Sequence, residues 1–206
     1  DYYERAHLNH ILAQQNPKTG MFAYMMPLMS GTAREFSSPE NDFWCCVLTG
    51  IESHSKHGDS IYWQSDDTLF VNLYIPSTLN WAAQKAAFQL DTKYPYDGHI
   101  AFKVTQLTGA KTFTVALRIP AWAANSKILV NGKPALATSA KGYALVRRKW
   151  RAGDVVTLDL PLDLRFEHTA GDEKVVALLR GPMVLTADLG AAEDKWEGDA
   201  PALVGA

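Results

Sequence analysis

The apolar residues of this chain change their spacing near Gly58, and that change limits the folds open to it. Before Gly58, the segments from Tyr2 to Gln15 and from Cys46 to about Lys56 place apolar residues at helical spacing and contain no proline. After it, short segments rich in β-branched and aromatic residues recur roughly every 8–12 positions between turn residues. Such a series is typical of an antiparallel β-sandwich. The sequence therefore predicts an α+β fold in which two helices, joined by a long loop, precede the sandwich.

The stretch from Thr112 to Ile119 alternates most regularly between apolar and polar residues, as a half-buried strand does. Asn131-Gly132 between two apolar runs has the pattern of a two-residue hairpin turn. Residues 76–80 read as a turn. The expected strands are residues 60–63, 68–75, 86–91, 99–106, 112–119, 128–130, the segment after Lys133, 143–146, 155–160, 175–179 and 183–186. The expected divisions are residues 1–59 for the helices, 60–186 for the sandwich and 187–206 for an irregular tail.

Composition excludes several classes of partner. The chain has 206 residues, of which 47% are hydrophobic, so it is long enough for a sizeable core. Its formal net charge is −2, and no run of like charges indicates a nucleic acid or an anionic membrane as partner. No apolar stretch approaches the roughly 18 residues that a membrane-spanning helix needs. We expect a globular protein with neither a nucleic-acid nor a membrane partner.

The two cysteines of the chain, Cys45 and Cys46, are adjacent in the sequence. Neighbouring Cα atoms lie about 3.8 Å apart, whereas an unstrained disulfide needs roughly 4.4–6.8 Å, so two free thiols are expected. The predicted helix begins at this pair, and a helix N-terminus lowers the pKa of a thiol and favours the thiolate. A thiolate serves both as a nucleophile and as a metal ligand. Small buried cysteines without chemistry are the alternative, and the local spacing leaves both open.

A zinc site on these thiols would need two further ligands. His54 and His57 follow on the same helix, but at about 1.5 Å per residue they lie more than roughly 10 Å from the cysteines. That distance is too large for one tetrahedral ion, so the missing ligands are expected before residue 1. On this helix, Val47 and Ile51, with Leu48 beside them, are expected to be buried. The residues expected on solvated faces are Glu4, Arg5, Glu52, His54, Lys56 and His57.

Several motifs together resemble one enzyme family. They are Asp1-Tyr2-Tyr3-Glu4-Arg5-Ala6, Gly20-Met21-Phe22-Ala23-Tyr24, Phe43-Trp44-Cys45-Cys46, Thr49-Gly50-Ile51-Glu52, Lys56-His57-Gly58-Asp59-Ser60-Ile61-Tyr62, Tyr94-Pro95-Tyr96-Asp97-Gly98, Leu117-Arg118-Ile119-Pro120-Ala121-Trp122, Val130-Asn131-Gly132-Lys133, Trp150-Arg151-Ala152-Gly153-Asp154 and Arg180-Gly181-Pro182. Each is weak alone, but the set covers nearly the whole chain. It is similar to the β-L-arabinofuranosidase glycoside hydrolases of family 127 and its relative, family 146.

The resemblance implies both a fold and a mechanism. In that family an (α/α)6 barrel carries the active site, and β-sandwich domains follow it, so this chain resembles the last barrel helices and the first sandwich. The family uses a zinc-bound cysteine as the nucleophile of a retaining double displacement. That role falls on Cys45 here, with Cys46 as a second zinc ligand, and with Glu4 and Tyr24 as contacts of the carbohydrate substrate. Zinc is the implied cofactor.

One departure from the family pattern concerns activity. The acid/base glutamate and the Glu-x-Cys zinc ligands of the family lie upstream of the motif that begins this chain, so we expect a C-terminal fragment that is inactive alone. Any export signal would also lie upstream, and plant-glycan substrates favour a periplasmic or secreted protein. The sequence leaves open whether the protein forms a homodimer. The alternative function is a non-catalytic carbohydrate-binding or structural sandwich module in which the cysteines are merely packed.

Overall fold

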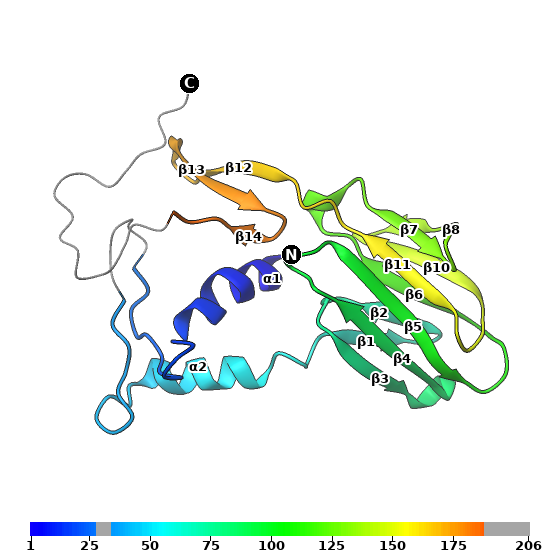
Figure 1. The fold of residues 1–206 in the computed structure, drawn as a ribbon, viewed down its shortest axis with the longest axis horizontal. Coiled ribbons are helices and arrows are strands. Elements are labelled where there is room, and N and C mark those ends of the chain that lie inside the picture. Colours follow the sequence, from blue (N-terminus) through cyan, green and yellow to red (C-terminus); the bar gives the residue numbers. More distant parts are fainter. Residues whose placement is uncertain (28–33, 188–206) are drawn as a thin grey trace.

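The computed structural model describes residues 1–27 and 34–187 of the chain. Helices precede strands, and the helical segments lie beside the sheets rather than between them (Figure 1). The α+β fold class expected from the sequence is confirmed. The tail expected to be irregular lies outside the described residues, apart from its first residue. Among the helices of the described part, none is long and apolar enough to cross a membrane.

The first helical run has three parts with different hydrogen-bond patterns. They are α1 (Tyr2–Ala6), the π-helical η1 (His7–Ile11) and the 3-10 helical η2 (Leu12–Gln14). Gln15 then takes an extended conformation two residues before Pro17, which cannot continue a helix. The predicted helix from Tyr2 to Gln15 is confirmed to within one residue.

The second helix, α2 (Cys45–Ser55), packs on the loop that follows the first helical run. Its buried residues are Val47 and Gly50, whereas Leu48 and Ile51 are 52% and 48% exposed. The expected burial of Leu48 and Ile51 is therefore wrong. Gly50 explains the difference, because a Cβ atom there would come within 2.5 Å of the Phe22 ring. Because Gly50 has no side chain, the face of α2 that carries Gly50 packs on Phe22, and the face that carries Leu48 and Ile51 is left exposed.

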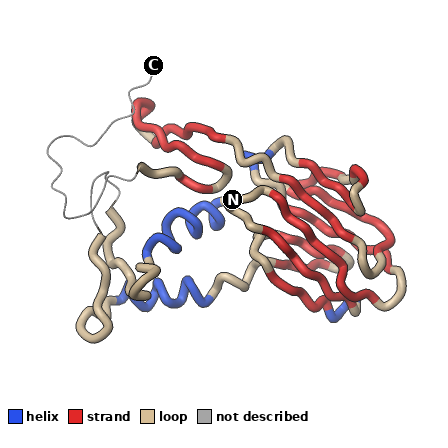
Figure 2. The backbone as a smooth tube through the Cα atoms, in the orientation of Figure 1, coloured by secondary structure: helices blue, strands red, loops and turns tan. Residues whose placement is uncertain are grey.

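Two sheets form the sandwich (Figure 2). The five-stranded sheet has the order β1 (Tyr62–Ser65), β2 (Thr68–Val71), β6 (Lys111–Arg118), β10 (Tyr143–Trp150) and β9 (Thr138–Ala140). The six-stranded sheet has the order β3 (Ser77–Trp81), β4 (Ala86–Thr92), β5 (His99–Leu107), β11 (Val155–Asp159), β7 (Lys127–Val130) and β8 (Lys133–Pro134). All pairs are antiparallel except β2 with β6, which is parallel. Two short 3-10 turns, η3 (Ala82–Gln84) and η4 (Ala121–Ala123), connect strands.

Aromatic rings fill the space between the two sheets. Phe88 stacks on Phe102 with ring centroids 4.9 Å apart, and Phe113 stacks on Trp150 at 5.7 Å. The Trp150 side chain is fully buried, and its indole N–H donates to the Phe113 carbonyl, so its one polar group is satisfied. This core makes the sandwich the main apolar body of the protein.

The expected hairpin at Asn131-Gly132 is present between β7 and β8, and both residues have the positive φ that the turn requires. The turn predicted at residues 76–80 is wrong. Ser77 to Trp81 form β3, because pairing with β4 satisfies their backbone and Trp81 is buried in the core. Strands β9 and β12 (Leu164–Thr169) were not expected, and burial in them is slight.

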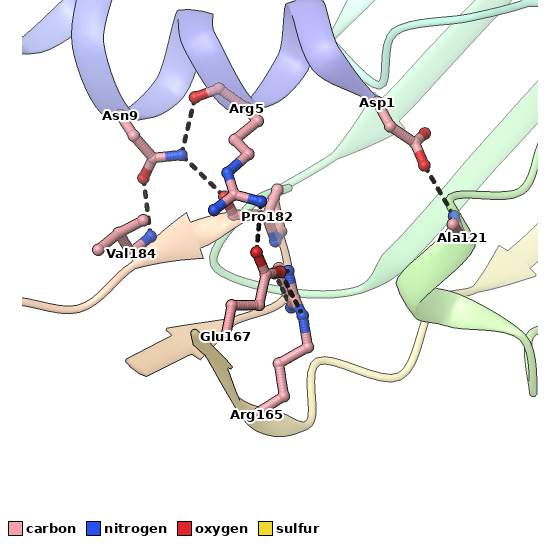
Figure 3. A network of polar contacts seen from close by, with 9 residues as sticks. Asp1, Arg5, Asn9, Ala121, Arg165, Glu167, Pro182 and Val184 are labelled. Atoms are coloured by element: carbon pink, nitrogen blue, oxygen red, sulfur yellow. Dashed lines mark hydrogen bonds and ion pairs between the residues drawn. The ribbon is translucent and has the colours of Figure 1, made fainter. Parts of the chain in front are cut away.

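A third sheet lies apart from the sandwich, beside the first helical run (Figure 1). It consists of β12, β13 (Asp172–Arg180) and β14 (Met183–Val184). Polar contacts join it to the first helices (Figure 3): Asn9 donates to the Pro182 carbonyl and accepts from the Val184 amide. Arg5 pairs with Glu167, which Arg165 also contacts. Helix and sheet are thus joined by directional contacts.

Candidate active site

The two thiols lie at the first turn of α2, as the sequence predicts. Trp44 precedes them with an extended backbone and provides no side-chain cap, so the N–H groups of the first turn receive no side-chain partner from it. Cys45 is exposed, Cys46 is half-buried, and neither forms a disulfide. Their Sγ atoms are 3.9 Å apart. Two sulfurs therefore face outward together at the positive end of a helix.

The contact between the thiols affects how they ionise. The hydrogen bond with Cys45 raises the pKa of the Cys46 thiol, and burial and the charge of Cys45 act in the same direction. The expectation of a lowered pKa is therefore wrong for Cys46, because the hydrogen bond with Cys45, burial and the Cys45 charge all raise it. A cation bound to the Cys46 sulfur would oppose this shift, because a positive charge favours the thiolate.

Two aromatic rings flank the thiols. Tyr24, from the loop after the first helices, packs edge-on against Trp44 with ring centroids 5.7 Å apart. The charge of Cys45, followed by that of Cys46, raises the pKa of the Tyr24 hydroxyl, which indicates that the ring lies close to the sulfurs. Tyr24 and Trp44 remain 44% and 37% exposed. They form an accessible aromatic wall beside Cys45.

Glu4 is in a different environment from Tyr24. Its side chain is buried, and its carboxylate pairs with the Arg118 guanidinium from the end of β6. Arg118 also contacts the Asp1 carboxylate at 2.7 Å and donates to the Asn72 carbonyl. The expected solvated position of Glu4 is therefore wrong, and the ion pair ties α1 to the sandwich.

The helix that carries Glu4 also begins in a different place from the helix that carries the thiols. Figure 1 shows α1 beginning next to the sandwich, whereas α2 begins at its end away from the sandwich. The structure therefore brings Tyr24 to the cysteines and leaves Glu4 elsewhere. The assignment of Glu4 as a sugar contact stays a prediction from the resemblance.

His54 and His57 do not join the cysteines. They hydrogen-bond to each other at 3.1 Å, and His57 packs on His7 while His54 packs on Phe22, so their expected solvation is wrong. Glu52 and Lys56 are exposed as predicted. Within residues 1–27 and 34–187, no group of three or more His, Cys, Asp or Glu side chains is arranged to hold a metal ion. Of the site residues predicted from the sequence, the structure groups Cys45, Cys46 and Tyr24.

Sequence comparison matches the two parts of the chain to two domains of one enzyme family. Residues 1–59 match the catalytic domain of β-L-arabinofuranosidase, GH127, and residues 68–162 match the GH127 middle domain. No curated protein matches the chain. The boundary between the two matches falls where the helices give way to the sandwich.

Solved structures give the same result. A GH127 β-L-arabinofuranosidase from Geobacillus stearothermophilus T6 superposes with a TM-score of 0.76 at 28% identity, over 88% of this chain and 31% of its own. A second GH127 β-arabinofuranosidase gives a TM-score of 0.77 at 28% identity, over 88% and 32%. A structure described as a glycoside hydrolase gives 0.75 at 23% identity, over 89% and 33%, and supports the fold alone.

The chain thus spans about a third of the length of these structures. Both of its parts match GH127 domains, and the thiol pair lies within the part that matches the catalytic domain. The chain belongs to glycoside hydrolase family 127, the β-L-arabinofuranosidase family.

Proposed function

We propose that the protein is a retaining glycosidase that releases β-L-arabinofuranosyl groups from plant glycans, with Cys45 as its nucleophile. The observation that carries this proposal is the free, exposed Cys45 thiol at the start of α2, beside the aromatic wall of Tyr24 and Trp44. The activity is proposed for the whole protein, because its relatives are about three times as long as this chain. Plant-polymer substrates also favour export to the periplasm or beyond.

The thiol pair fits a zinc ion. Two thiolates bound at about 2.3 Å to a tetrahedral zinc lie about 3.8 Å apart, and the Sγ atoms of Cys45 and Cys46 are 3.9 Å apart. Zinc, when bound, keeps both sulfurs deprotonated near neutral pH, which the raised pKa of Cys46 otherwise opposes. Cys45 and Cys46 would supply two of its four ligands. We assign the other two to parts of the protein outside these 206 residues.

The proposed reaction has two displacements at the anomeric carbon. In the first, the Cys45 sulfur forms a bond to that carbon while the bond to the leaving oxygen breaks and a carboxylic acid protonates that oxygen. In the second, the resulting carboxylate takes a proton from water, whose oxygen displaces the sulfur and restores Cys45. Two inversions retain the configuration. We assign the acid/base carboxyl group outside this chain, because the family resemblance places that glutamate upstream of the motif at residues 1–6. Glu4 is not a candidate for this role, since its carboxylate pairs with Arg118.

Tyr24 and Trp44 are the proposed sugar contacts beside the nucleophile. Their exposed ring faces can pack on the apolar C–H groups of a furanose, and the Tyr24 hydroxyl can hydrogen-bond to a sugar hydroxyl. These contacts hold the anomeric carbon near Cys45. Glu4 as a further contact is retained as a proposal from the family resemblance, and it would require Glu4 to leave Arg118.

The test compares full-length wild type with Cys45→Ser on p-nitrophenyl β-L-arabinofuranoside under reducing conditions, with bound zinc measured in both. We expect a loss of at least about a thousandfold in kcat, because a serine hydroxyl is a poor nucleophile at neutral pH. Mass spectrometry of the quenched wild type should find a pentosyl group on the peptide that contains Cys45.

Ser55→Ala is the matched control, because Ser55 lies on the same helix at its opposite end and its hydroxyl donates to the Glu52 carbonyl. Its activity and zinc content should equal those of wild type. Equal activity of wild type and Cys45→Ser would refute the proposal, as would a zinc-free and inactive wild type. Either result would favour a non-catalytic sandwich module with packed cysteines.

A further inference from the structure

Three histidines form a cluster between the first helical run and α2, away from the thiols. His7 of η1 packs edge-on against His57 with ring centroids 4.4 Å apart, and His57 bonds to His54 of α2 at 3.1 Å between ring nitrogens. Tyr3 stacks on His7 at one end, and Phe22 packs on His54 at the other. We call His7, His54 and His57 the histidine cluster. It joins the two helices and the loop between them.

The cluster has unpaired nitrogens. The Nδ1 atoms of His7 and His57 and the Nε2 atom of His54 are buried and lack a hydrogen-bond partner among the described residues. Whichever ring donates in the bond between His54 and His57, one buried N–H and one buried bare nitrogen are left over. Adding a proton to this pair would create a second unpaired N–H together with a charge. Burial makes both unfavourable.

The charged side chains of the elements that pack around the histidine cluster pair with other residues or are exposed to solvent. On the first helical run, Glu4 pairs with Arg118 and Arg5 with Glu167, and His10 is exposed. On and after α2, Glu52 pairs with Lys56, and Asp59 is exposed. Tyr3 and Phe22 contribute only neutral rings. No described carboxylate contacts the cluster, so a proton there would meet other histidines and not a counter-ion.

The direction of the pKa shifts agrees with this geometry. Burial lowers the pKa of His7, and the charges of His57 and His54 lower it further. Burial also lowers the pKa of His57, followed by the charge of His54. The pKa of each of these histidines is lower in the folded state than the unfolded value of about 6.5. The contact between the neutral rings therefore contributes its full stabilisation above that pH. Its contribution falls as the pH drops from 6.5 toward the folded pKa.

We propose that the histidine cluster is an acid-sensitive contact that holds the first helical run against α2 only while its rings are uncharged. This inference is independent of the proposed function, since it concerns the packing of two helices. Mild acid should loosen these helices and leave the sandwich intact.

The test is amide hydrogen exchange of the full-length protein at pH 7.5 and pH 5, with rates corrected for intrinsic exchange. Protection in η1 and α2 should fall by no more than about tenfold for each unit by which the folded pKa of a histidine lies below its unfolded pKa, whereas β5 and β6 should keep their protection. His57→Gln removes the titrating ring at the centre of the cluster and should abolish most of this pH dependence. His10→Gln, an exposed histidine on the same helical run, is the matched control and should retain it.

A histidine NMR titration of the wild-type chain gives an independent answer if His57→Gln fails to fold. His7 and His57 should titrate below 6.5. The proposal would be overturned by pKa values at or above 6.5 for both residues. It would also be overturned by helix protection that does not change with pH, or by a fall of equal size in His57→Gln.

Discussion

The sandwich and the helical region are stabilised in different ways. The sandwich has a continuous apolar core that includes the fully buried rings of Trp150, Phe113 and Phe88. In residues 1–59, the buried hydrophobic residues among those described are Phe22, Ala23 and Val47. Large apolar side chains in that region are instead exposed: Tyr2, Met25, Phe43, Leu48 and Ile51. Burial of apolar side chains stabilises the sandwich, whereas a few directional contacts hold the helices.

This difference determines how each region should respond to change. Apolar burial is spread over many side chains, so the sandwich loses stability in proportion to the volume removed from it. The helical region is held by Arg118, by Asn9 and by the histidine cluster, each of which depends on charge or hydrogen-bond geometry. Substitutions can therefore test the contrast one region at a time.

Trp150→Ala should have the largest effect on stability. It opens a cavity beside Phe113 and removes a fully buried ring, which costs about 3–5 kcal/mol of the free energy of unfolding. Urea unfolding followed by far-UV circular dichroism measures the loss. Trp63→Ala is the control, since Trp63 is 59% exposed on β1 and should change the value by less than about 0.5 kcal/mol. Equal losses of unfolding free energy in the two variants would show that the buried core is not the main source of stability.

Arg118→Met should come next, with a cost of about 3 kcal/mol. It leaves the Glu4 carboxylate buried without its partner, and removing one member of a buried pair exposes the full desolvation cost of the other. Arg147→Met is the matched control, because the Arg147 pair with Asp67 lies on the surface, where solvent screens such pairs and their loss changes the free energy of unfolding little. Similar urea midpoints for the two variants would contradict the structural role assigned to Glu4.

Gly50→Ala should have a smaller effect, confined to the helical region. The new Cβ would lie 2.5 Å from the Phe22 ring, so α2 or Phe22 must shift, at about 1–3 kcal/mol. Hydrogen exchange should report faster exchange in α2 with little change in β5. Gly58→Ala has no atom within 4 Å of the added Cβ and should leave exchange unchanged. Slower exchange in Gly50→Ala would mean that helix propensity outweighs the steric contact.

Local patterns predicted much of the fold. The alternation through Phe113 and Val115 predicted β6, and Asn131-Gly132 predicted the hairpin between β7 and β8, because both patterns are set by neighbouring residues. Strand β3 was missed because Pro76 and Asn80 are typical of turns, whereas pairing with β4 decides its conformation. Burial of α2 was misjudged because the usual apolar stripe was assumed. The packing of Gly50 on Phe22 depends on a loop 28 residues earlier.

The candidate site was predictable in one part only. Adjacent cysteines before a proline-free segment located Cys45 and Cys46 at the helix start. The family resemblance, and not spacing, pointed to Tyr24. Neither approach revealed that Glu4 pairs with Arg118, which is 114 positions away in sequence. The spacing of His54 and His57 by three residues was visible, but His7 belongs to another helix, so only the tertiary fold identifies the cluster.

Arg118 also links strand register to helix placement. It is the last residue of β6 and lies opposite Tyr143 of β10, while its guanidinium reaches Asp1 and Glu4. A slip of β6 by one residue would turn every side chain of the strand to the opposite face. Arg118 would then point into the apolar interior, and the carboxylates of α1 would find no cation there. The ion pairs with the first helix thus form only in the native register, so docking of that helix stabilises this register over a slipped one.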